Sequence, residues 1–154
     1  MSDDADLALS RRLAPPVHAV WAAWSSAGAV SRWFAPRPWR AEVTALELHP
    51  GGAFVTVLHG PGGERQENAG CILEAAPCSR LVFTTALGPG FRPAAPALPM
   101  TAEIAMTADG PGTLYAVRVL HASAADRDRH AAMGFEEGWG AAVDQLEEVA
   151  AGFL

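Results

Sequence analysis

Hydrophobic and polar residues alternate in short runs through most of the chain, which is the pattern of half-buried β-strands. The run over residues 6–14 predicts a first strand. Pro15 and Pro16 follow it, and a helix can begin there because the N–H that proline lacks would be unpaired in the first turn. Apolar residues at helical spacing then predict two short helices, over residues 15–26 and 27–34.

Six further alternating runs predict six more strands, over residues 39–48, 53–59, 66–77, 80–87, 100–107 and 113–121. The turns between them are too short for crossover helices, so we expect an antiparallel meander. Residues 88–99 hold four prolines and two glycines, and this composition predicts a loop that makes no strand pairing. Glu103 and Arg118 lie on the polar sides of neighbouring strands and are expected to pair across the outer face.

One long amphipathic helix is predicted from residue 123 onward. Its apolar residues recur at steps of three and four: Phe135, Trp139, Ala142, Leu146, Val149 and Phe153. Ser123 lies three residues before Asp126, which is the spacing of a helix N-cap. The helix also contains Gly134, Gly138 and Gly140, although each glycine costs a helix about 1 kcal/mol relative to alanine. Two interpretations stay open: the helix closely approaches the sheet or a ligand, or the glycines bend it around the sheet.

Together these elements predict an α+β fold with one domain over residues 1–154. A curved antiparallel sheet of about seven strands would wrap around the long C-terminal helix, and two short helices would follow the first strand. A space remains between sheet and helix wherever the facing residues are small.

Composition and charge exclude several classes of function. Half of the 154 residues are hydrophobic, so the chain is expected to fold around a core. The net charge is −6 and the eleven basic residues, all arginine, are scattered, which argues against a nucleic-acid-binding face. No apolar run approaches the roughly 20 residues that cross a bilayer, and the acidic start is unlike a secretory signal. We therefore expect a cytoplasmic protein without membrane insertion.

Several blocks in order resemble a known family: residues 17–36, 47–57, 80–87, 112–121 and 129–149, the last reading RHAAMGFEEGWGAAVDQLEEV. The whole chain resembles the START-like, or SRPBCC, helix-grip superfamily. Within it the chain is similar to the branch named for activator of heat shock protein 90 ATPase homologues. The resemblance implies a cavity between the sheet and the long helix that binds apolar or amphipathic small molecules. It implies no catalytic motif.

The cavity is expected to be lined by inward-facing residues of the strands and the long helix: Phe54, Met100, Ile104, Met106, Tyr115, Val117, Met133 and Trp139. Trp33, with Phe34 beside it, and Phe91 in the proline-rich loop are expected near the opening. These residues would bind the ligand through apolar contact.

The titratable residues give two candidates for acid–base chemistry. His121 ends a strand whose inward face should line the cavity, so it is either a general base or a strand-end histidine bonded to the backbone. Glu136 is either an acid with a raised pKa or part of the solvated flank of the helix. The five histidines show no metal-binding spacing, and no metal or other cofactor is expected.

Three functions follow from these observations. The favoured one is binding of an apolar or amphipathic small molecule, and the sequence leaves open whether a reaction is catalysed. The second is a polyketide cyclase- or hydratase-like enzyme that uses His121 or Glu136. The third is a chaperone-associated stress adaptor, which would need an exposed apolar patch. A homodimer stays open, and ligand identity is not encoded in any motif.

Overall fold

The computed structural model describes residues 3–154, so Met1 and Ser2 of the predicted domain lie outside the described residues. Its elements are η1 (Asp3–Ala5), β1 (Asp6–Leu13), α1 (Val17–Trp24), α2 (Ala27–Ser31), β2 (Arg40–Leu46), β3 (Ala53–His59), β4 (Arg65–Ala76), β5 (Arg80–Thr84), β6 (Leu87–Gly88), η2 (Pro89–Phe91), β7 (Arg92–Pro93), β8 (Met100–Asp109), β9 (Gly112–His121), α3 (Ala124–Ala132) and α4 (Phe135–Ala151). Within residues 3–154 no helix combines the length and the apolar character needed to cross a membrane.

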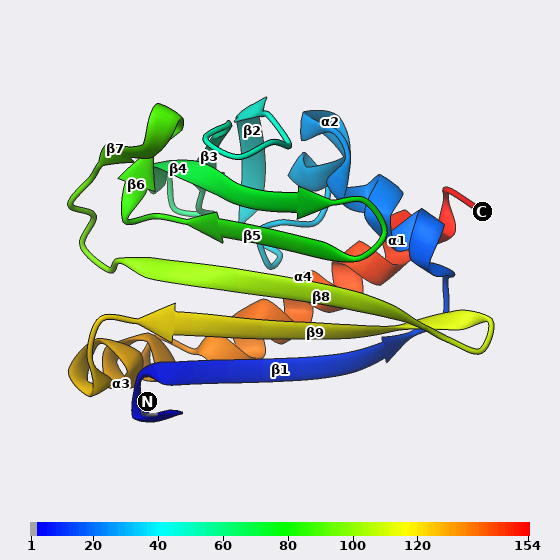
Figure 1. Ribbon diagram of the computed structural model, residues 1–154. Helices are drawn as coiled ribbons and strands as arrows, with labels where there is room; N and C mark the ends of the chain where they lie inside the picture. The colour runs from blue at the N-terminus through cyan, green and yellow to red at the C-terminus, as the bar shows by residue number, and fades with distance from the viewer. Residues whose placement is uncertain (1–2) are drawn as a thin grey trace.

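The predicted α+β architecture is confirmed. Seven strands form one antiparallel sheet in the order β1-β9-β8-β5-β4-β3-β2, and α4 runs along one face of it (Figure 1). The predicted strand over residues 53–59 has the bounds observed for β3, and the other six differ by a few residues at their ends. The two short helices also form where expected, and the Ser26 side chain caps α2 by accepting a hydrogen bond from the backbone N–H of Ala29.

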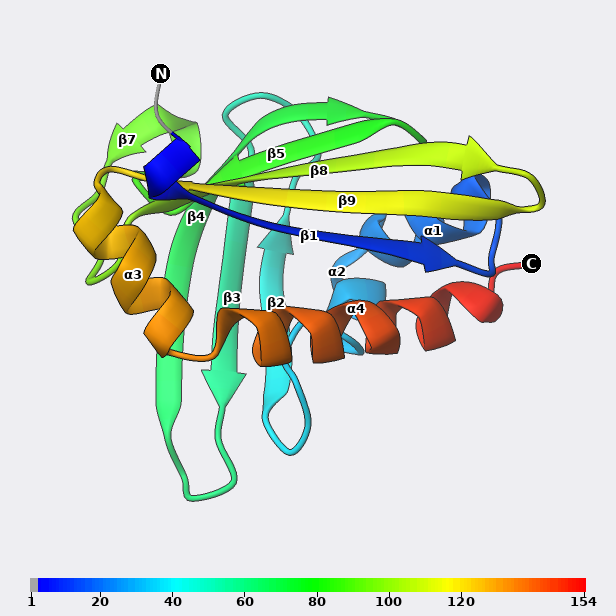
Figure 2. The ribbon, with the colours of Figure 1, turned by 90° about the horizontal axis from the view of Figure 1, so that it is seen from below.

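The sheet bends at β4, which pairs with β3 along its first part and with β5 along its last. The register with β5 shifts between Ile72 and Glu74, and such a bulge bends a strand. Gly70 lies at the same place, where an added Cβ would come within 2.9 Å of the carbonyl oxygen of Thr84. Figure 2 shows the consequence: β2, β3 and the start of β4 turn across the direction of β1, β8 and β9, and α4 runs beneath them.

The predicted single C-terminal helix is wrong in one respect, because it is broken into α3 and α4. Gly134 separates them with a left-handed φ of +91°, a conformation that other residues adopt at a cost. The Ser123 side chain caps α3 by accepting a hydrogen bond from the backbone N–H of Asp126, as predicted. Of the two interpretations of the glycines, the bend is therefore correct for Gly134.

The proline-rich interval was predicted to make no strand pairing, and this is also wrong. β6 and β7 form a two-residue antiparallel pair in which Leu87 faces Pro93 and Gly88 faces Arg92. Gly90 turns the chain between them with a φ of +74°. A ladder this short tolerates Pro93, since proline is accepted at the edge of a sheet.

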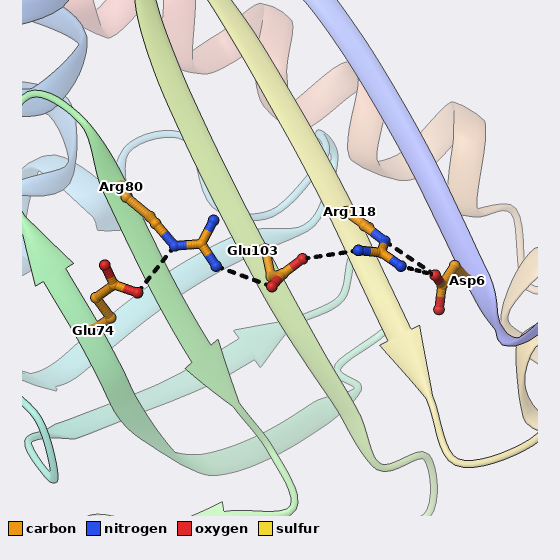
Figure 3. Close-up of polar contacts among 5 residues, drawn as sticks. All are labelled: Asp6, Glu74, Arg80, Glu103 and Arg118. Atoms are coloured by element: carbon orange, nitrogen blue, oxygen red, sulfur yellow. Dashed lines mark hydrogen bonds and ion pairs between the residues drawn. The ribbon is translucent and has the colours of Figure 1, made fainter. Parts of the chain in front are cut away.

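The outer face of the sheet carries a chain of ion pairs across five adjacent strands (Figure 3). Arg80 bonds Glu74 and Glu103, each at 3.0 Å, and Arg118 lies 3.6 Å from Glu103 and also bonds Asp6. The predicted pairing of Glu103 with Arg118 is thus confirmed. The polar residues of these strands face outward, which leaves their apolar residues to face α4.

Candidate functional site

A cavity of about 680 Å³ lies between the inner face of the sheet and the helices α3 and α4. This volume is within the range of small-molecule sites in proteins. Two of the residues that line the cavity from α4 are small and leave space beside the larger Phe135 and Trp139: these are Gly138 and Ala142, and a Cβ added at Gly138 would meet no atom within 4 Å. Four exposed lining residues mark its opening, which we call the mouth: Gln66, Ala97, Arg129 and Met133.

Five aromatic rings form one wall of the cavity: Trp24, Trp33, Phe34, Phe54 and Phe83. They come from α1, the segment after α2, β3 and β5, and they meet edge to face or tilted. The ring centroids of Trp24 and Trp33 are 4.7 Å apart, and those of Phe54 and Phe83 are 4.9 Å apart. Such contacts stabilise rings beyond the area they bury, so this wall is a rigid apolar surface.

The opposite wall is formed by α3 and α4. Phe135 and Trp139 have ring centroids 5.4 Å apart, and the His130 ring is 5.3 Å from Phe135 and 6.2 Å from Trp139. All three line the cavity together with Gly138. The break at Gly134 brings His130 at the end of α3 beside the first turn of α4.

One buried side chain on α4 fixes the segment that carries Trp33. The amide nitrogen of Gln145 donates to the carbonyl oxygens of Trp33 and Ala35, at 3.0 and 2.8 Å, and its oxygen accepts from the backbone N–H of Arg37 at 3.0 Å. All the polar atoms of this side chain are therefore bonded to one stretch of backbone. The contact holds residues 33–37 against α4, so both walls of the cavity meet there.

Tyr115 places a hydroxyl group on the wall of the cavity. Its oxygen accepts a hydrogen bond from the indole N–H of Trp24 at 2.9 Å, and burial raises the pKa of the phenol above its usual value. The phenol is therefore neutral and keeps its hydrogen. Among residues 3–154 no acceptor bonds that hydrogen, so it is available to a molecule in the cavity.

The two histidines at this end of the fold bond each other. Nδ1 of His121 lies 2.8 Å from the carbonyl oxygen of Ala5, and its Nε2 lies 2.9 Å from Nδ1 of His130. His130 is 8 % exposed and lines the cavity. Burial, and secondly the neighbouring His121, lower its pKa to about 4, so at neutral pH it carries no charge.

Eight of the ten predicted lining residues lie on the cavity wall: Trp33, Phe54, Met100, Ile104, Tyr115, Val117, Met133 and Trp139. Their contact with a ligand stays a prediction. The other two are corrections. Phe91 is half exposed and its ring lies against Gly51, outside the cavity, because the β6–β7 turn folds back on the chain before β3. Met106 is buried in the core where α1 packs on β8 and β9, beyond the end of the cavity.

Neither predicted acid–base candidate lines the cavity. Both ring nitrogens of His121 are bonded, one of them to backbone, so the strand-end interpretation is correct. Glu136 is exposed in a separate polar depression beside Asp6 and Arg127, on the solvated flank of α4. This removes the geometric basis for acid–base chemistry by either residue. Within residues 3–154 no three His, Cys, Asp or Glu side chains are grouped to hold a metal ion.

Sequence reasoning missed His130, Trp24, Phe83 and Arg129 as cavity residues. Trp24 lies on the apolar stripe of α1 and is buried there, and helical spacing alone does not distinguish a core residue from one that also borders a cavity. In the sequence, His130 belongs to the polar start of the predicted helix. The break at Gly134 is what places its side chain on the cavity wall. A signal was present for Phe83, since it lies on β5, which pairs with β8, and the inward residues of β8 were chosen.

Comparison with known proteins agrees with this geometry. A search of curated proteins finds no match. A crystal structure of a protein from Nitrosomonas europaea is 39 % identical, with a TM-score of 0.91 over 97 % of this chain and 96 % of that one. A solution structure of an Arthrobacter aurescens protein shares the fold at 21 % identity, with a TM-score of 0.85 over 97 % of this chain and 87 % of the other.

A third solved structure is described as an AHSA1-like protein, from Aeromonas hydrophila. It is 17 % identical, with a TM-score of 0.72 over 97 % of this chain and 95 % of that chain, which shows the fold alone. The predicted helix-grip fold is thus confirmed. The model of one family matches residues 14–151, nearly the whole of the described chain. The chain belongs to the family described as activator of Hsp90 ATPase homolog 1-like proteins.

Proposed function

We propose that this protein binds an amphipathic small molecule in the cavity between the sheet and α4. The observation that carries the proposal is a space of about 680 Å³ whose wall is mainly aromatic and aliphatic, with few polar groups. A site built only for stability would be filled, because each unfilled volume in a core costs free energy. Selective binding needs this combination of apolar wall and a small number of placed polar atoms.

The apolar wall supplies enough free energy for useful affinity. Removing about 300 Å² of apolar ligand surface from water contributes roughly 7.5 kcal/mol, close to the 8 kcal/mol of a micromolar complex. Loss of the ligand's translational freedom opposes this gain. Polar contacts within the cavity are therefore expected to decide which apolar molecules bind.

The mouth gives a route for the ligand. Met133 is 68 % exposed there, and a flexible thioether adapts to different apolar surfaces. One turn before it on α3, the Arg129 side chain donates to the carbonyl oxygen of Ala97 at 2.7 Å and so ties α3 to the loop before β8.

Two measurements test the proposal. Native mass spectrometry of the protein purified from its own host should retain a small molecule, and the neutral dye Nile red should bind in solution with enhanced fluorescence. Gly138→Phe places a ring in the open space of the cavity and should abolish both signals. Ala141→Phe adds the same ring to the same helix at a residue that does not line the cavity, and should preserve them.

The proposal is contradicted by either of two results. One is the absence of any retained molecule and of any Nile red binding by folded protein. The other is equal binding by the Gly138→Phe and Ala141→Phe variants, which would place the dye outside the cavity.

A further inference from the structure

The contact between the two histidines determines the hydrogen-bonding character of one end of the cavity. The carbonyl oxygen of Ala5 only accepts, so Nδ1 of His121 must carry the hydrogen of their 2.8 Å bond. In a neutral ring Nε2 is then the acceptor. With His121 neutral, Nδ1 of His130, 2.9 Å away, is the donor, and Nε2 of His130 keeps an unshared lone pair.

This lone pair is available within the cavity. His130 is 8 % exposed and lines the cavity, and none of residues 3–154 bonds its Nε2. The lowered pKa of His130, about 4, keeps the ring neutral at physiological pH. Nε2 keeps some accessible surface, because the described residues include no buried side-chain nitrogen or oxygen without a partner, so a ligand that covers it must supply a donor in place of water.

The ring of Trp139, which carries a donor, lies beside the ring of His130. The centroids of the His130 and Trp139 rings are 6.2 Å apart, and both residues line the cavity. The indole N–H of Trp139 has no acceptor among the described residues. The same end of the cavity therefore offers one acceptor and one donor. A hydroxyl group complements both at once, whereas an ether oxygen or a carboxylate only accepts.

We propose that the ligand of the cavity carries a hydroxyl group, as an alcohol or a phenol, that donates to Nε2 of His130 and accepts from the indole N–H of Trp139. This inference rests on the proposed function and specifies its ligand class. A carboxylate is disfavoured because it would face the lone pair of His130. The nearby Arg129 guanidinium is already bonded to Ala97 and Asp126 at the mouth.

Displacement of Nile red by chain-matched probes tests the proposal: 1-decanol, its isomer 1-methoxynonane, and decanoate. In the wild type, 1-decanol should bind about fivefold more tightly than the ether, the effect of one hydrogen bond, and decanoate should bind most weakly. His130→Asn keeps an N–H that can reach His121, and its amide oxygen takes the place of the ring carbon Cδ2, so no acceptor remains at the position of Nε2. In this variant the alcohol and the ether should bind with about equal affinity. Trp139→Phe should weaken the binding of the alcohol and of the ether equally, because both oxygens can accept from the indole N–H.

A measurement on the wild type makes the test independent of variants. The ¹⁵N chemical shifts of the imidazoles should show His130 with hydrogen on Nδ1 and an unprotonated Nε2 at pH 7. The reverse tautomer would overturn the proposal, as would equal affinity for alcohol and ether in the wild type. In both cases Nile red binding that is lost in Gly138→Phe would leave the proposed function standing. Failure of every probe and of the dye itself would remove both.

Discussion

The two ends of α4 face the same sheet but differ in how they meet it. Toward the C-terminus, Leu146 and Ala150 are fully buried and Val149 nearly so, and the helix packs against α1 and β1. Toward the N-terminus, Gly138 and Ala142 leave the cavity open. We call these the packed end and the hollow end.

The difference shows that one amphipathic helix can border both a core and a cavity, because Gly138 and Ala142 leave space beside the larger Phe135 and Trp139. Both ends continue the same apolar stripe, and the register of that stripe does not change. Close packing at one end supplies stability, because filled volume there contributes both transfer and dispersion free energy. The hollow end forgoes part of that gain and keeps space for a ligand.

The largest expected effect of a single change is at the packed end. Leu146→Ala removes a side chain with no exposed surface and should lower the free energy of unfolding by about 2–5 kcal/mol. Met133→Ala, at the mouth of the hollow end, removes a side chain that is 68 % exposed and should change it by no more than about 0.5 kcal/mol. Chemical denaturation of the two variants measures both values. Similar losses would erase the distinction between the ends.

Next in size is the acid sensitivity of the hollow end. The pKa of His130 is about 4 in the folded protein, lowered from the ordinary value of 6.5. Below pH 6.5 the unfolded chain therefore binds a proton that the folded ring still excludes, and stability falls as the pH decreases from 6.5 to 4. Above pH 6.5 the ring is neutral in both states and contributes no dependence. Denaturation midpoints across this range should decline more steeply in the wild type than in His130→Asn, and parallel declines would contradict the assignment.

Two glycines at the hollow end should respond to alanine with opposite signs. Gly134 has a φ of +91°, so Gly134→Ala is strained and should destabilise the protein by about 1 kcal/mol or more. Gly138 is inside α4 with open space around its Cβ position, so Gly138→Ala should stabilise by up to about 1 kcal/mol. Thermal unfolding compares the two. A loss at both positions would mean that Gly138 is needed for close packing and not for space.

The smallest effect is expected on the outer face, away from both ends. Glu103 is 26 % exposed between Arg80 and Arg118. Glu103→Gln removes the shared carboxylate charge, yet partly exposed ion pairs contribute little, so the loss should stay below about 1 kcal/mol and shrink in high salt. A larger, salt-independent loss would show that the ion pairs and not the packed end hold the sheet.

Local patterns predicted most of the fold. Alternation located the seven strands of the large sheet, and Ser123 capped α3 where its spacing indicated. The break at Gly134 was left open because a glycine in a helical pattern is compatible with both a bend and a close contact. The β6–β7 pair was missed because proline argues against a ladder, while the pairing depends on the chain folding back at Gly90.

The cavity was predicted less completely than the fold. Residues at alternate strand positions, such as Ile104, Tyr115 and Val117, could be assigned to the inner face from sequence. Where the cavity ends depends on α1 covering the sheet, and this excluded Met106. The bond between His121 and His130 joins a strand end to a helix end, and no local pattern encodes it.

The most direct test of the account is to map where 1-decanol acts, by ¹H–¹⁵N NMR titration of the wild type. The indole N–H of Trp139 and the backbone N–H groups of Gly138 and His130 should shift, while those of Leu146 and Ala150 at the packed end should not. Shifts on the outer face alone, or none at saturating alcohol, would contradict a ligand site at the hollow end.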